Sequence, residues 1–400
     1  MTEPVARPVG RDRGAGEATG FSDEALFLTD APVPGVEKQP RNEAAGHAWS
    51  RTLTDWSGLE AFADQWRELA SAATEPNPFY EPWMLLPALR SFAARERVEV
   101  ILAFRGDVLC GVFPVAYRRG RAEIWRHPYC YLTAPLLRRG CERIAIRCWL
   151  DAMAGRAAVI RIGDMPASGR VRMHLVDELN ERGWPALSTQ AYTRAVLRRA
   201  GSPDEFLTRA LAGKRRKEFR RQRTRLSELG ALTTDALAPG ADPAPWIDEL
   251  LSLESGGWKG RAGVDSVADR AFLAEMAKGA AREGKLQMLA LRLDGRPLAL
   301  KLNLFAGEGA FAFKIAFDET YARFSPGVLL ELDNVEHAHR LPSLRWMDSC
   351  AAANRFMINH LWPDRREVHT VFFATGSRRG ALTVALVPLL HFARQLAGRG

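Results

Sequence analysis

The stretch FAFKIAFDETYARFSPGVLL, Phe311 to Leu330, decides the fold of the second half of the chain. It reads as a β-strand up to Phe317, then as an irregular loop, and then as a helix that starts at Ser325-Pro326-Gly327. Serine at the cap and proline at the first helical position are expected to leave the amides of Gly327 and Val328 free. Such a helix start is either an anion site, suited to a phosphate or pyrophosphate, or a cap that contacts only water.

A strongly basic segment, Lys214 to Arg225, precedes this stretch. Eight of its twelve residues are basic and one is acidic, so it carries +7 in a chain whose net charge is +9. The sequence Ser202-Pro203-Asp204-Glu205 is a capping box with proline at the first helical position, and apolar residues recur at helical spacing from Leu207 to Leu229. The basic segment is therefore expected to be the middle of one amphipathic helix, which bends at Gly213.

Three interpretations of this basic segment stay open. As a solvated face it needs no function, but like charges at helical spacing repel each other. As a nucleic-acid patch it has only Phe219 between its cations, so contact with tRNA is the one specific form we consider. As a phosphate clamp for a nucleotide-bearing ligand, it would bind through Arg220 and Arg221.

The chain as a whole is expected to be an α/β protein with a mixed sheet flanked by helices. Two hairpins resemble each other, one over Val98–Tyr117 and one over Lys285–Phe305, and each follows helices and precedes another strand and helix. We interpret this pattern as a duplicated module. Further strands are expected at 124–132, 157–162, 310–317, 344–348 and 368–374, and further helices at 54–73, 85–94, 142–153, 171–183, 246–253, 268–283 and 328–339.

Composition and cysteine usage predict a cytoplasmic protein. Residues 1–47 read as a disordered tail, followed by an N-terminal module over 48–194 and a C-terminal module over 195–400. No secretory signal is visible, and the longest apolar run, 381–393, is too short for a membrane span. The five cysteines are odd in number and include no C-x-x-C pair, which favours reduced thiols and no metal site.

The C-terminal half resembles the GNAT acyltransferase superfamily, and most closely its BioF2-like branch (CelD/BcsL, related to FemAB). The residues that carry the resemblance are Ala316-Phe317-Asp318, Tyr321 and Ser325 to Leu330, followed by Met347-Asp348 on the next strand. The basic helix ahead of the domain fits the same branch. In place of the superfamily's R/Q-x-x-G-x-G/A pyrophosphate loop the chain has Ser325-Pro326-Gly327, and Arg323 is displaced by one position. The resemblance extends to two tandem GNAT-like modules.

The resemblance implies transfer of an acyl group from acetyl-CoA or another acyl-CoA to an amine, on a small molecule or a glycan precursor. Donor-binding residues would then include Arg323, Ser325, Gly327 and Val328, besides the arginines of the basic helix. Such chemistry needs a base, for which Asp348 is the first candidate and Asp318 and Glu254 are the rivals. Two alternatives stay open: an aminoacyl-tRNA-dependent transferase like the Fem proteins, and a module of polysaccharide assembly that has lost its chemistry. The oligomeric state and the acceptor stay open.

Candidate acceptor contacts come from strand and loop positions. Strand alternation puts Lys301 and Asn303 on one face, which contacts substrate if it lines the central cleft and is ordinary if it faces solvent. Lys314 interrupts another apolar strand, and Tyr321 lies in the loop that follows it. The glycine-rich segment with Trp258 and Lys259 is either a lid over an acidic or sugar acceptor or a surface turn.

Overall fold

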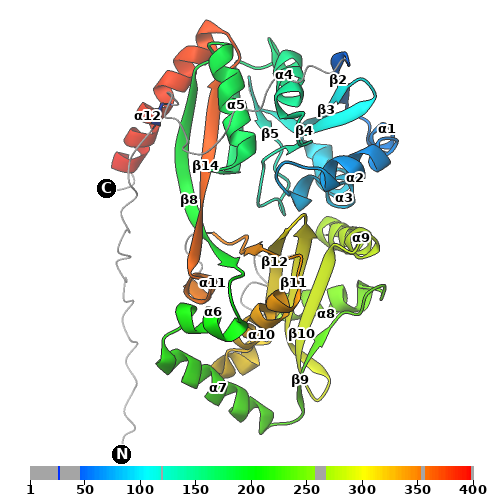
Figure 1. Cartoon of the computed structure of the whole chain (residues 1–400), viewed down its shortest axis with the longest axis vertical. Helices are drawn as coiled ribbons and strands as arrows, with labels where there is room; N and C mark the ends of the chain where they lie inside the picture. The colour runs from blue at the N-terminus through cyan, green and yellow to red at the C-terminus, as the bar shows by residue number, and fades with distance from the viewer. Residues whose placement is uncertain (1–25, 28–45, 119, 257–266, 353–355, 398–400) are drawn as a thin grey trace, which may run out of the picture.

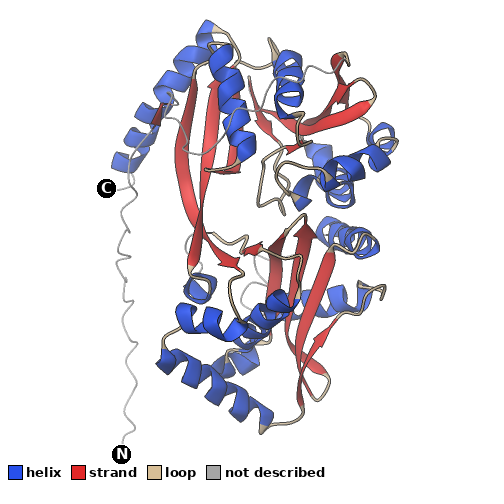
Figure 2. Cartoon of the chain, in the orientation of Figure 1, coloured by secondary structure: helices blue, strands red, loops and turns tan. Residues whose placement is uncertain are grey.

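The computed structural model describes residues 26–27, 46–118, 120–256, 267–352 and 356–397. Their strands join into one mixed sheet of fourteen strands with helices on its faces, as the α/β expectation requires (Figures 1 and 2). In chain order the strands are β1 (Leu26–Phe27), β2 (Ala48–Leu53), β3 (Arg97–Arg105), β4 (Val108–Arg118), β5 (Arg121–Ile124), β6 (Leu136–Leu137), β7 (Val159–Pro166), β8 (Ala186–Arg198), β9 (Leu232–Ala236), β10 (Leu286–Leu293), β11 (Arg296–Ala306), β12 (Gly309–Phe317), β13 (Trp346–Asp348) and β14 (Asp364–Ala374).

The helices fall between these strands in both halves of the chain. They are α1 (Trp56–Glu60), α2 (Ala63–Ser71), α3 (Pro82–Phe92), α4 (Glu142–Met153), α5 (Arg170–Glu181), α6 (Pro203–Ala210), α7 (Gly213–Ser227), α8 (Ala244–Gly256), α9 (Val267–Arg282), α10 (Pro326–Arg340), α11 (Phe356–Leu361) and α12 (Arg378–Ala397), with short 3-10 helices η1 (Pro78–Tyr80), η2 (Ala93–Arg95) and η4 (Glu319–Phe324).

The strand order shows that the chain is a duplicated module. It runs β2-β3-β4-β5-β7-β14-β8-β13-β12-β11-β10-β9. From each edge, four antiparallel strands are followed by one parallel neighbour, which is β7 beside β5 and β13 beside β12. The crossover helix to that parallel strand is α4 in one half and α10 in the other. The duplication that the two similar hairpins predicted is therefore present in the topology.

The two modules are joined through the middle of the sheet, by β8 and β14. These strands pair along most of their length, and they run past both modules in Figure 1. The predicted module boundary between residues 194 and 195 lies inside β8, and β14 and α12 pack on the N-terminal module's β7. One continuous hydrophobic cluster includes Trp66 of the first module and Phe311 of the second. The last strand of the chain therefore lies beside β7 of the N-terminal half.

Most of the expected elements are present, and the differences have local causes. Both hairpins are confirmed, and the helix expected at 171–183 ends as predicted, with Gly183 in the left-handed region at φ +63° and its amide bonded to the Asn180 carbonyl. The helix expected over 54–73 is divided into α1 and α2. The strand expected over 124–132 ends at Ile124, and β8 was not expected at all.

The termini are described only in part. Of the tail expected to be disordered, residues 1–25 and 28–45 lie outside the described residues, whereas β1 pairs with β8. Within the described ranges no helix combines the length and the apolar character that crossing a bilayer requires. All five cysteines are buried free thiols.

Candidate functional site

The basic segment forms a helix of its own, not the middle of a longer one. The Ser202 side chain accepts the amide of Glu205 and the Glu205 side chain accepts that of Ser202, so the capping box starts α6 as predicted. The chain then becomes extended at Leu211 and Ala212, and α7 begins anew at Gly213. The expected bend is thus a complete break, which lets α7 turn against α10 (Figure 1).

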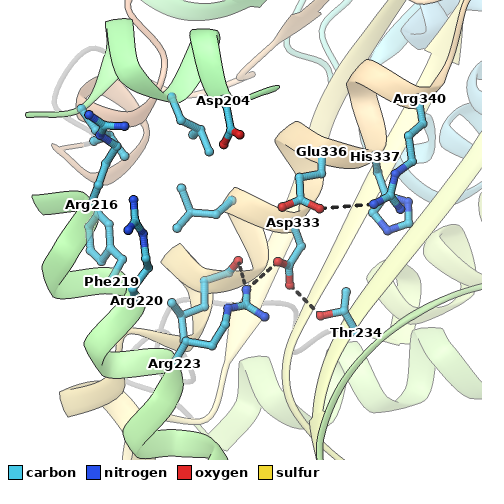
Figure 3. A pocket seen from close by; sticks show the side chains of 14 residues that line it. Asp204, Arg216, Phe219, Arg220, Arg223, Thr234, Asp333, Glu336, His337 and Arg340 are labelled. Carbon is cyan, nitrogen blue, oxygen red and sulfur yellow. Dashed lines mark hydrogen bonds and ion pairs between the residues drawn. The ribbon is translucent and has the colours of Figure 1, made fainter. Parts of the chain in front are cut away.

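A cavity of about 510 Å³ lies between α6, α7, β9 and α10 (Figure 3). Its wall contains cations of α7 opposite carboxylates of α10 and α6, with leucine side chains between them. The lining residues are Asp204, Leu207, Leu211, Arg216, Phe219, Arg220, Arg223, Thr234, Leu329, Leu332, Asp333, Glu336, His337 and Arg340. Helix α7 also contacts η4, the loop that leads into α10.

The three arginines that α7 directs at this cavity differ in their partners. Arg223 pairs with Asp333 and donates to the Leu329 carbonyl at 3.2 Å. Arg216 donates to the Thr208 hydroxyl at 2.8 Å. Arg220 forms no ion pair with any carboxylate in the described part of the chain. Neither Arg216 nor Arg220 has an ion pair within the described residues, so these two cations of the wall are available to an anionic ligand.

Arg221, which the sequence grouped with Arg220, lies elsewhere. It does not line the cavity, and it pairs with Glu218 of the same helix at 2.7 Å. Both partners are about half exposed, so this pair contributes little to stability. The two adjacent arginines therefore point to different surroundings, which follows from the 100° rotation between neighbours on a helix.

The helix start at Ser325 is less open to an anion than the sequence suggested. Ser325 is in the left-handed region at φ +52°, and its side chain makes no capping hydrogen bond. The Val328 amide was expected to be free, but it donates to the Ser325 carbonyl at 2.9 Å. Gly327 is buried, and a Cβ there would lie 3.2 Å from the Phe317 ring, so close packing accounts for this glycine. Arg323 is exposed and stacks on Phe324, which also contacts Tyr321.

The opening of the sheet lies between β12 and β13. These parallel strands pair only from Gly309 to Phe311 with Trp346 to Asp348, and β12 then continues to Phe317 without β13 beside it. A crevice beyond the carboxyl ends of parallel strands is where open α/β sheets bind ligands. Asp348 ends β13 at this place, as expected from the sequence.

The surroundings of Asp348 do not favour the predicted role of base. Its carboxylate is fully buried, lies 2.8 Å from Arg366 and 3.4 Å from Arg194, and accepts the Cys350 amide at 2.9 Å. Two guanidinium groups and a backbone amide thus occupy both of its oxygens. Asp348 therefore holds β13, β8 and β14 together.

Asp318 also has partners that weaken it as a base. Partial burial acts to raise its pKa, but hydrogen bonds from Thr320 and the charge of Arg296 hold that pKa below its usual value. The carboxylate caps the first turn of η4. A carboxylate with a lowered pKa accepts a proton less readily, so the structure gives Asp318 a role in shaping the loop before α10.

Lys301 and Asn303 face neither solvent nor a cleft, the two alternatives that the sequence left open. Helix α10 covers them. The Lys301 amine lies 2.7 Å from the Glu331 carboxylate, and both side chains are 2% exposed or less. Asn303 donates to Asn334 at 2.8 Å, and Asn334 donates to Glu331 at 2.8 Å. These residues form a buried polar network that fixes α10 on the sheet.

Lys314 belongs to a second buried ion pair, on the other side of the sheet. Its amine lies 2.8 Å from Glu254 of α8, and each side chain is 11% exposed. The Tyr129 ring of the N-terminal module packs over this amine, with 5.4 Å from Nζ to the ring centroid. Trp258 and Lys259 lie outside the described residues, and no group of His, Cys, Asp and Glu suited to a metal ion occurs within them.

Several residues of the site were missed from sequence. Arg194 lies in β8, which was not predicted, and Arg366 lies in β14, whose start was predicted four residues too late. Had β8 been recognised, its buried arginine would have indicated a buried carboxylate partner. Tyr129 lies in a loop of the other module, and no local pattern marks it. Arg223 was visible in the basic segment, but only its place opposite Asp333 separates it from its neighbours.

Comparisons with known proteins identify the fold of the chain. Residues 213–356 match the family model of the acetyltransferase (GNAT) domain, which spans α7 to the start of α11. No curated protein sequence matches the chain. One similar solved structure is the C-terminal domain of a putative lysylphosphatidylglycerol synthetase from Agrobacterium fabrum, with 11% identity and a TM-score of 0.53 over 82% of this chain and 95% of that one.

Two further structures show the same fold. FemX has 10% identity and a TM-score of 0.53, over 80% of this chain and 96% of that one. A conserved protein of unknown function from Bacteroides thetaiotaomicron has 11% identity and a TM-score of 0.51, over 78% of this chain and 96% of that one. At these identities the likeness concerns the fold. The predicted relation to GNAT and FemAB-like acyltransferases is confirmed at that level.

Proposed function

We propose that this chain, an acyltransferase with a GNAT domain at residues 213–356, moves an acyl group from an acyl-CoA such as acetyl-CoA to an amine. The observation that carries the proposal is the cavity between α7 and α10, where Arg216 and Arg220 have no carboxylate partner within the described residues; α7 also contacts η4, which leads into α10. Arginine forks suit phosphate groups, and a nucleotide-bearing donor supplies them. Similarity of Ala316 to Leu330 to the BioF2-like branch supports an acceptor in cell-envelope or exopolysaccharide (cellulose) synthesis.

The parts of the site have separate tasks in this proposal. The phosphates lie in the cavity, along α7 and the face of α10 that lines it. The acyl end reaches the opening between β12 and β13, where the backbone of β12 beyond Phe311 has no partner in β13. Backbone amides at such an edge are suited to polarise a thioester carbonyl. The amine then attacks the carbonyl carbon and displaces the CoA thiol.

A second donor is favoured by the outer face of α7. Lys214, Arg215, Lys217 and Arg225 are exposed, and none of them has an ion pair within the described ranges. Such a face suits a longer polyanion, so an aminoacyl-tRNA is the alternative donor, in keeping with the Fem-like fold. The loss of all chemistry is the remaining alternative, in which the chain only assists polysaccharide assembly.

The test compares two neighbouring charge reversals. Calorimetric titration with acetyl-CoA is expected to give at least tenfold weaker binding for Arg220→Glu, because one charge-assisted phosphate contact contributes about 1.5–3 kcal/mol. Arg221→Glu is the matched control, since it makes the same change one residue away and outside the cavity. Equal effects of the two changes on binding would show that the cavity does not bind the phosphates of the donor.

The same titration distinguishes the donors. Binding of uncharged tRNA with a steep dependence on salt, without binding of acetyl-CoA, would replace the acyl-CoA proposal by the aminoacyl-tRNA one. If neither ligand binds and no acyl transfer to amines is detected, the chain has the fold without the chemistry.

A further inference from the structure

The buried pair of Glu254 and Lys314 lies at the opening of the sheet, where it can take part in the reaction as well as stabilise the fold. Lys314 follows the last pairing of β12 with β13 by three residues. Its amine holds one carboxylate oxygen of Glu254, Oε1, at 2.8 Å. Each side chain keeps 11% of its surface exposed, so this pair is less enclosed than the Lys301–Glu331 pair across the sheet, whose side chains are 2% exposed or less.

The second carboxylate oxygen of Glu254 is the feature without a structural explanation. Oε2 is buried and has no hydrogen-bond partner in the described part of the chain. Buried carboxylate oxygens nearly always accept a hydrogen bond, because burying one without a hydrogen-bond partner costs about 1–3 kcal/mol or more. The other two candidate carboxylates, Asp348 and Asp318, have their oxygens engaged by arginines and amides. Glu254 is therefore the carboxylate with capacity for a new donor.

The groups around Glu254 suit a cationic amine. Tyr129 of the N-terminal module packs over Lys314 and donates its hydroxyl to Asp269 at 2.9 Å. Burial, and then the hydrogen bond to Asp269 and the charge of Glu254, raise the pKa of Tyr129, so its hydroxyl stays protonated. Tyr131 lies near the same carboxylate, and burial raises its pKa to about 12. Two carboxylates against one ammonium leave the cluster with one net negative charge.

We infer that Glu254 is the catalytic residue that takes the proton from the acceptor's ammonium group, with Lys314 and Tyr129 as its positioning residues. This assignment rests on the proposed acyl transfer. It gives the N-terminal module a part in the site, because Tyr129 belongs to the loop after β5.

The step balances without another reactant. The ammonium proton passes to Glu254 Oε2, and the neutral nitrogen bonds to the thioester carbonyl carbon. The carbon–sulfur bond breaks, the thiolate takes the second proton of the nitrogen, and Glu254 returns its proton to solvent. Lys314 holds the other carboxylate oxygen, Oε1, at 2.8 Å and so fixes the position of the carboxylate.

The experiment measures acetyl transfer from acetyl-CoA to glucosamine, ethanolamine and lysine as probe amines, across pH 5 to 9. Glu254→Gln keeps the size of the side chain and an oxygen for Lys314, and it is expected to lower kcat/KM at least 100-fold and to abolish the acidic limb of the pH profile. The affinity for CoA is expected to stay within twofold. Glu249→Gln is the control, since Glu249 lies on the same helix and pairs with Arg292 away from the opening.

Glu254→Asp tests the assignment if the glutamine variant fails to fold. Aspartate keeps the charge but is one methylene shorter. We therefore expect kcat/KM to fall tenfold or more, with the acidic limb of the pH profile retained. Transfer in Glu254→Gln at the wild-type rate and pH profile would overturn the assignment and leave the proposed function intact. Absence of transfer by the wild-type protein to all three amines would refute the acyl-CoA proposal, and the assignment with it.

Discussion

Replacing Lys301 by methionine separates the structural role of this residue from the substrate contact that its sequence position suggested. The substitution keeps an unbranched side chain, one atom shorter, and removes its charge. Glu331, 1% exposed, is then left buried without its cation, although Asn334 still donates to it at 2.8 Å. Removing one partner of a buried pair costs about 3–5 kcal/mol, because the remaining charge is uncompensated.

The size of the loss follows from three variants compared in guanidinium unfolding. Lys301→Met is expected to lower the free energy of unfolding by about 3–5 kcal/mol. Adding Glu331→Leu removes the orphaned carboxylate and is expected to restore all but about 1 kcal/mol, the net worth of the hydrogen bond that Asn334 loses. Arg340→Met is the control on the same helix, since its pair with Glu336 is exposed and its loss costs less than about 1 kcal/mol.

The opposite pattern would refute this reasoning. If Lys301→Met unfolds at the wild-type denaturant concentration and raises KM for the amine, Lys301 contacts substrate and the buried pair is not what fixes α10. A double variant no more stable than the single one would show that the lost charge of Glu331 is not the cause.

Three further outcomes are expected. Burial raises the pKa of Glu81 to about 7, so its proton is bound more tightly in the folded chain; stability should fall by about 3 kcal/mol between pH 4.5 and 7, and Glu81→Gln should remove this slope in unfolding curves. The neighbouring Cys110 thiol lowers the pKa of Cys141, so thiolate absorbance should titrate below the range of an ordinary cysteine and disappear in Cys141→Ser. In Gly213→Ala the added Cβ meets no atom within 4 Å, so the higher helix propensity of alanine should raise the free energy of unfolding by up to about 1 kcal/mol.

Much of the fold could be predicted because its signals are local. The turn at Gly106 and the Asp294-Gly295 turn mark both hairpins, and the capping box at Ser202 marks the start of α6. The break between α6 and α7 was harder to predict, because Leu211 continues the apolar spacing of a helix although the backbone becomes extended there. Strand β8 was missed although Thr193, Val196 and their neighbours favour a strand, because polar residues within it obscure the alternation.

The site could be predicted only as a set of residue types. The sequence indicated cations on α7 and carboxylates near the strand ends, but burial decides which of them is available. Asp348 is where it was expected, at the end of β13, yet two arginines from strands far apart in sequence occupy it. Glu254 was a rival candidate, and what distinguishes it is that one of its oxygens has no hydrogen-bond partner among the described residues.

By itself the sequence determined a duplicated α/β chain with a GNAT-like second half and a basic helix before it, since periodicity, caps and turns act over a few residues. Only the tertiary structure decided that β14 returns to the first module, that Arg220 and Arg221 face different surroundings, and that Lys301 is buried while Lys314 lies at an opening. These outcomes depend on which distant strand or helix covers each face, and such covering decides whether a charge is paired, solvated or left for a ligand.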